Sequence, residues 1–141
     1  MNDRPTAVEL LAAARGFLET ELIPTLADAR IKFQTLVTAN VLAIVERELQ
    51  TEEDHLRIEW SEIAGLSVKP GPPPRETASL RQAVLQYSQE LCERIRRGEF
   101  DESNKFLPML SQLRASVVRK LKVANPRYLA DFAKDERLNS I

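Results

Sequence analysis

One short pattern in the sequence could bind a metal ion, because Glu52 is followed three residues later by His55 and then by Glu59. Residues at this spacing share a helix face, and paired Glu-x-x-His elements hold di-iron or di-manganese sites in helical bundles. His55 is the single histidine of the chain, so one chain cannot supply both elements. We therefore expect no metal and no other cofactor, and keep Glu52, His55 and Glu59 as the alternative.

Nucleophilic catalysis has no clear candidate either. Cys92 is the single cysteine, and nothing in the local sequence places it near His55. A lone cysteine on a helix usually packs as a small apolar side chain. The sequence also lacks a glycine-rich phosphate loop and a G-x-S-x-G motif. We expect a protein without enzymatic activity.

The second candidate site centres on Asn40, which lies in the middle of an apolar arc of its helix. A buried amide without a partner costs about 1–3 kcal/mol, so we expect this side chain to be hydrogen-bonded. Its partner could be a neighbouring helix, in which case Asn40 fixes the packing register. Alternatively, Asn40 lines a ligand pocket together with Tyr87 and Arg47.

Helices must position these residues, and the first half of the chain predicts three. Thr6 and Glu9 have the spacing of a capping box, which begins the first helix, and Pro24 ends it. A second helix over about 29–50 is apolar on most sides, as a central helix would be. Thr51 is expected to cap a third helix. The main apolar arc of the second helix comprises Phe33, Leu36, Val37, Val41 and Ile44.

The second half predicts three more helices. One spans about 77–97 and ends at Gly98; the next begins within 101–108, because Pro108 fits only near a first turn. Asn125 ends that helix and caps a short last one. The residues expected to be buried are Leu80, Val84, Tyr87, Leu91 and Ile95 in the first of these, and Leu110, Leu113, Val117 and Leu121 in the next. No segment alternates with the period of a strand, so we predict an all-α bundle of about five to six helices.

The stretch "SVKPGPPPRE" at 67–76 interrupts this helical pattern after the third predicted helix. As a linker it would separate two halves of about 70 residues, a size at which a lone core is marginal. As a ligand it offers a P-x-x-P-x-R pattern for proline-recognition domains. We predict the third possibility, a loop within a single helical domain over 1–141 rather than a domain boundary.

Charge and hydropathy narrow the partners. The net charge is −1, and residues 76–141 carry 12 Lys and Arg against 9 Asp and Glu. This basic segment shows no aromatic platform of the kind that single-strand binders use. We expect no nucleic acid partner. No apolar run approaches the ~18 residues of a membrane span, and the N-terminal segment does not resemble a secretory signal. The expected location is the cytoplasm, without membrane association.

Three segments carry a resemblance: "RPTAVELLAAARGFLETEL" at 4–22, "VTANVLAIVERELQ" at 37–50 and "KLKVANPRYL" at 120–129. They resemble a small bacterial family of unknown function, typically encoded beside aminoglycoside-phosphotransferase-like kinases and acyl-CoA dehydrogenases. The resemblance implies a bacterial cytoplasmic protein and transfers no catalytic residue.

Two functions remain open. We favour a non-enzymatic helical accessory or interaction module, whose partner would be a phosphotransferase-like or acyl-CoA dehydrogenase-like protein and which could also form a homodimer. Such a protein should expose a large apolar patch. The alternative is a bundle that binds an acyl- or CoA-like small molecule in a pocket near Asn40.

Overall fold

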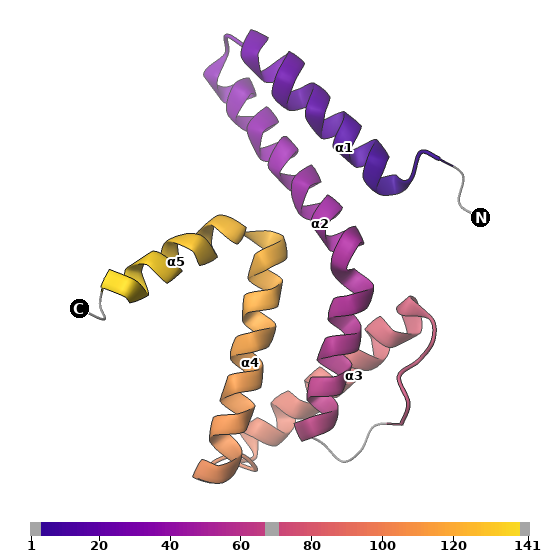
Figure 1. The fold of residues 1–141 in the computed structure, drawn as a ribbon, viewed down its shortest axis with the longest axis vertical. Helices are drawn as coiled ribbons and strands as arrows, with labels where there is room; N and C mark the ends of the chain where they lie inside the picture. The colour runs from indigo at the N-terminus through magenta and orange to yellow at the C-terminus, as the bar shows by residue number, and fades with distance from the viewer. Residues whose placement is uncertain (1–3, 67–70, 139–141) are drawn as a thin grey trace. The chain divides into compact units, whose positions relative to one another are not determined.

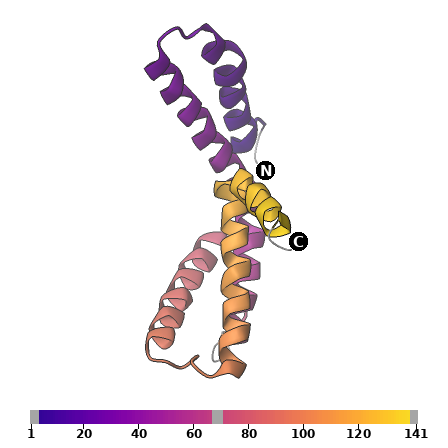
Figure 2. The same ribbon diagram turned by 90° about the vertical axis from the view of Figure 1, so that its left-hand side faces the viewer.

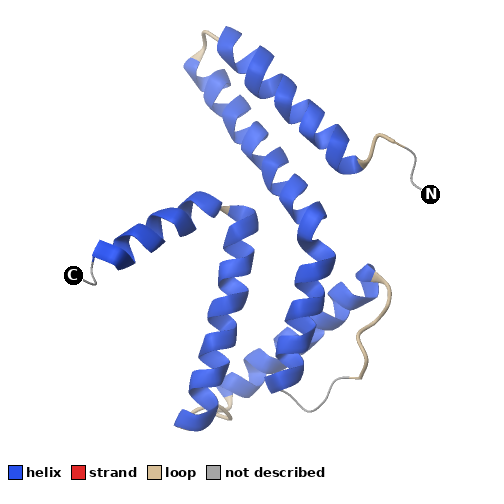
Figure 3. Ribbon diagram, in the orientation of Figure 1, coloured by secondary structure: helices blue, strands red, loops and turns tan. Residues whose placement is uncertain are grey.

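The computed structural model describes residues 4–66 and 71–138, and within these ranges every regular element is helical (Figure 3). The predicted all-α class is therefore confirmed. No described helix combines the length and the hydropathy that a membrane span requires. The α-helices are α1 (Ala7–Phe17), α2 (Ala29–Leu66), α3 (Thr77–Arg96), α4 (Ser103–Ala124) and α5 (Pro126–Leu138).

The chain divides into two compact units, Met1–Thr51 and Glu52–Ile141, called here the N-terminal and the C-terminal unit. α2 contributes its first part to one unit and its last part to the other. A single domain over 1–141 stays a prediction.

In the N-terminal unit, α1 runs antiparallel beside the first part of α2 (Figures 1 and 2). The predicted capping box is confirmed, because the Glu9 amide donates to Thr6 Oγ1 at 3.2 Å and the Thr6 amide donates to the Glu9 carboxylate at 2.7 Å. A π-helical turn (Leu18–Leu22) and a 3-10 turn (Ile23–Thr25) follow α1, so helical structure ends around Pro24, as predicted.

α2 continues through Thr51, where the sequence predicts a new helix. The Thr51 hydroxyl donates to the Arg47 carbonyl one turn earlier, at 2.8 Å, instead of capping a helix start. Neither glycine nor proline occurs between 29 and 64, so nothing in the chain breaks the helix there. The second and third predicted helices are thus one, and the proline stretch follows the second α-helix. Its residues 71–76 are non-helical, whereas 67–70 lie outside the described residues, so the full loop stays a prediction.

The C-terminal unit holds most of the buried apolar side chains. One cluster joins the end of α2 to α3, and a second joins α3 to α4; Figure 2 shows α3 leading into α4 through a turn. The predicted face of α3 is confirmed, since Leu80, Val84 and Leu91 are buried. The clusters comprise Trp60, Ile63, Leu80 and Val84 in the first, and Leu91, Phe100 and Met109 in the second.

The helix ends of this unit lie where the sequence predicts them. Gly98 adopts a φ of 78° after α3, and a Cβ there would lie 2.8 Å from Asp101 Oδ2. Asn125 caps α5, because its Oδ1 accepts from the Tyr128 amide at 3.2 Å. α4 begins at Ser103, within the predicted range of 101–108, and Pro108 lies in its second turn.

Candidate interaction surfaces

An apolar stripe on the N-terminal part of α2 faces outward. Phe33, Val37, Asn40 and Ile44 follow each other at spacings of four, three and four residues, which keeps them on one side of a helix. Leu36 and Val41 widen this side. The exposed fractions of the apolar members reach 67% at Phe33, and only Ile44 is half-buried. These six residues are called the α2 stripe. The sequence predicts that its apolar members are buried, which is wrong for all but Ile44.

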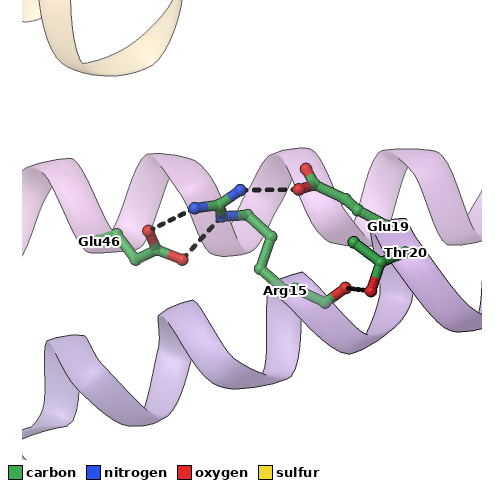
Figure 4. Close-up of polar contacts among 5 residues, drawn as sticks. Arg15, Glu19, Thr20 and Glu46 are labelled. Carbon is green, nitrogen blue, oxygen red and sulfur yellow. Dashed lines mark hydrogen bonds and ion pairs between the residues drawn. The ribbon is translucent and has the colours of Figure 1, made fainter.

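The opposite side of α2 faces α1 and carries Ala39, Glu46 and the half-buried Leu42 and Val45. Ala39 is the only buried apolar residue in the described part of the N-terminal unit, and Glu46 is buried two turns later on the same side. The Arg15 guanidinium donates to both oxygens of Glu46, at 2.9 and 3.2 Å, and to Glu19 at 2.8 Å (Figure 4). The bond to Glu46 raises the pKa of Arg15, so the guanidinium stays charged. The bidentate pair of Arg15 with Glu46 therefore links α1 to α2.

A second apolar stripe lies on α4. Phe106, Leu110, Leu113 and Val117 have the same spacing of four, three and four residues, and all four are exposed. These residues are called the α4 stripe. The sequence predicts burial of its last three members, which is wrong. Next along the chain, α5 exposes Tyr128 and Phe132, whose rings stack at 6.3 Å.

The side of α4 that faces its own unit is anchored by the core and by charge pairs. Met109 is buried in the second cluster, the Arg119 guanidinium donates to both oxygens of Glu62, and Lys120 Nζ lies 3.2 Å from Glu59. Arg119 and Lys120 thus form ion pairs within the unit. The exposed side of α4 is therefore marked mainly by its apolar stripe.

The three residues of the predicted ligand site differ in their unit and in their contacts. Asn40 is exposed, so the expectation of a buried amide is wrong, while the expectation that an apolar arc surrounds it is correct. Arg47 belongs to the same unit, whereas Tyr87 belongs to the C-terminal unit and packs edge-on against Trp60, with ring centroids 5.2 Å apart. Tyr87 accordingly acts as a part of the first apolar cluster.

Two of the three residues of the alternative metal site form ion pairs with basic side chains. The Arg81 Nε donates to Glu52 at 2.7 Å, and Glu59 pairs with Lys120, while His55 is half-buried. Across the described ranges, no group of three or more His, Cys, Asp or Glu residues could hold a metal ion. Glu52, His55 and Glu59 therefore gain no support as ligands.

A hollow of about 220 Å³ lies between α2, α3 and α4 in the C-terminal unit. The buried Oε1 atom of Gln112, which lines it, has no hydrogen-bond partner. Cys92 also lines it and is exposed, although its position on a helix favoured burial. Pockets for small ligands usually measure about 300–1,000 Å³, so this hollow is small for an acyl- or CoA-like molecule. Sequence reasoning gave no signal for Gln112, because its carbonyl becomes isolated only through the packing of three helices.

Comparison with known proteins bears on the family and leaves the activity open. No curated protein matches the chain, and no solved structure matches it. A family model does match, over residues 24–128, which include α2, α3, α4 and the start of α5. The matched region covers well over half of the chain, and the chain therefore belongs to the family described as Domain of unknown function (DUF6285).

Proposed function

We propose that this protein is a non-enzymatic helical interaction module that binds a partner protein through the α4 stripe. The observation that carries the proposal is the exposure of Phe106, Leu110, Leu113 and Val117 on one side of a helix whose other side is anchored in the core. Contiguous apolar patches of this kind are uncommon on isolated soluble domains and mark interaction sites.

The chemistry of the stripe indicates the kind of contact. Apolar residues at four-three-four spacing form the anchors by which one helix fits an apolar groove of another protein. Tyr128 and Phe132 on α5 add aromatic side chains, which contribute strongly to binding energy at interfaces.

The partner we favour is a phosphotransferase-like enzyme, with an acyl-CoA dehydrogenase-like protein as the second choice, in the cytoplasm of a bacterium. Support comes from the resemblance of segments 4–22, 37–50 and 120–129 to a family that is typically encoded beside genes for such enzymes. The protein would then be an accessory subunit that acts through contact rather than chemistry.

Affinity purification of the tagged protein from its native cell, with mass spectrometry of the eluate, tests this function. We expect stoichiometric recovery of one enzyme of these two classes. Leu110→Asp should abolish that recovery by placing a charge in the interface. Leu85→Asp is the matched control, because Leu85 is 60% exposed on α3, outside the stripe.

Both variants should keep the helical circular dichroism of the wild type, because both positions are exposed. Recovery of the wild-type protein alone would contradict the accessory role. Equal recovery of the enzyme with Leu110→Asp and with Leu85→Asp would contradict the assignment to the α4 stripe.

A further inference from the structure

Asn40 gives the α2 stripe a polar centre. It occupies the third position of the series Phe33, Val37, Asn40 and Ile44, and apolar side chains surround it. In packed helix pairs, a single asparagine within an apolar seam selects the register and the number of helices, at a cost in stability. An exposed asparagine at such a position points to a specific partner that covers it.

We propose that the α2 stripe binds the α2 stripe of a second copy of this chain, in antiparallel orientation, with the two Asn40 amides paired at the two-fold axis. The proposal goes beyond the interaction role of α4, because it uses another helix face and another unit.

The asparagine amide favours a second copy as the occupant. Each amide has a hydrogen-bond donor and an acceptor, so two Asn40 side chains related by a two-fold axis can satisfy each other. An apolar surface of another protein would bury the Asn40 amide without a partner and incur its desolvation penalty. A copy of the same stripe supplies the matching group without any further requirement.

The charges at the two ends of the stripe favour the antiparallel orientation. Arg30 lies ten residues before Asn40 and Glu48 lies eight residues after it, and both are exposed. Around a two-fold axis at Asn40, Arg30 of each copy meets Glu48 of the other with an offset of about 3 Å, which long side chains can span. In a parallel pair, Arg30 of one copy and Glu48 of the other would be separated by 18 residues, about 27 Å along the helix axis, so these charges would not meet.

The apolar residues fit the same orientation. Leu36 lies four residues before Asn40, and Ile44 lies four residues after it. An antiparallel pair centred on Asn40 therefore places Leu36 of each copy opposite Ile44 of the other, on both sides of the amide pair. The side of the helix that carries Ala39 and Glu46 remains in contact with α1.

Charge reversal tests the orientation in the full chain. Sedimentation equilibrium should show a concentration-dependent dimer for the wild type. Arg30→Glu and Glu48→Arg should each weaken the dimer by about tenfold, and the double variant should restore it. Glu21→Arg is the matched control, because Glu21 is exposed in the same unit but belongs to the segment after α1. We expect no change for this variant.

Disulfide formation tests the centre of the pair. In a Cys92→Ser background, which removes the single native cysteine, Asn40→Cys should oxidise to a covalent dimer, since the two positions lie opposite each other. Phe33→Cys should not, because seven residues on each side of the axis separate the two thiols by about 21 Å. Wild-type sedimentation as a monomer at all concentrations would overturn the proposal. Cross-linking at both positions, or failure of the double charge reversal to restore the dimer, would overturn the antiparallel arrangement.

Discussion

The α2 stripe and the α4 stripe have the same four-three-four spacing, but the helices that carry them are held in different ways. Behind the α4 stripe, Met109 joins an apolar cluster of the C-terminal unit. Behind the α2 stripe lie Ala39 and the charge pair of Arg15 with Glu46. The difference teaches that apolar periodicity identifies a helix face, while the opposite face decides whether the helix is anchored by a core or by a few directed polar contacts.

The largest effect should come from the buried apolar clusters of the C-terminal unit. Leu80 is 1% exposed, so Leu80→Ala should lower the free energy of unfolding by about 2–5 kcal/mol through lost burial and a residual cavity. Leu85→Ala, five residues further along α3, should change it by less than about 0.5 kcal/mol, since that side chain is exposed. Urea unfolding followed by circular dichroism measures both. Equal losses would mean that the first cluster does not dominate this unit.

A smaller loss is expected where a charge pair replaces a core. The Glu46 side chain is 11% exposed, so Glu46→Gln should cost about 1–2 kcal/mol by weakening its two bonds with Arg15. Glu53→Gln is the control, because its i, i+4 pair with Arg57 is exposed and should be worth about 0.3–0.5 kcal/mol. The same unfolding experiment applies. A loss for Glu46→Gln no larger than for Glu53→Gln would show that the pair of Arg15 with Glu46 does not stabilise the packing of α1 against α2.

At its third position the α2 stripe is polar, with Asn40, whereas the α4 stripe is apolar, with Leu113. Asn40→Leu makes the α2 stripe fully apolar, and it should tighten self-association by about tenfold while allowing more than one oligomeric state. Leu113→Asn, the converse change in the α4 stripe, should leave self-association unchanged. Sedimentation velocity measures both. Weaker association of the Asn40→Leu variant would mean that the amide contributes more affinity than a leucine at this position.

The smallest effect should arise at the turn between α3 and α4. The Arg94 guanidinium donates to Glu99 at 2.7 Å and lowers the pKa of that carboxyl group. Since the pKa is lower in the folded state, the pair stabilises at pH values above the unfolded value of about 4.3 and is lost as the pH falls through the folded value. Glu99→Gln should therefore lower the melting temperature at pH 7 by at most about 2 °C.

At an acidic pH below the lowered pKa of folded Glu99, the difference between Glu99→Gln and the wild type should disappear, because the carboxyl group is then protonated in both states. Thermal unfolding at the two pH values measures the effect. A difference that persists in acid would assign it to the side chain's packing rather than to its charge.

The sequence predicted the parts of the fold that depend on local chemistry. The capping box of Thr6 and Glu9, the cap at Asn125 and the end of α3 at Gly98 were all correct, because each follows from hydrogen bonds or backbone angles within a few residues. The break expected at Thr51 was wrong, because a threonine hydroxyl can also bond within a helix.

Burial was predicted well on one helix and poorly on two. The apolar face of α3 is buried as expected, but large side chains of α2 and α4 that form equally regular faces are exposed. Periodicity cannot tell whether a face is covered by the same chain or by another molecule. Asn40 was therefore placed correctly on its face, although its environment could not be predicted.

Trp60 is the only tryptophan of the chain, and it is buried in the first cluster of the C-terminal unit. Its emission thus reports on one half of the molecule and is blind to loosening of the hairpin of α1 and α2. Fluorescence and ellipticity should yield coincident unfolding curves only if both units lose structure together. A comparison of the two signals therefore tests whether Met1–Thr51 and Glu52–Ile141 unfold in one cooperative transition.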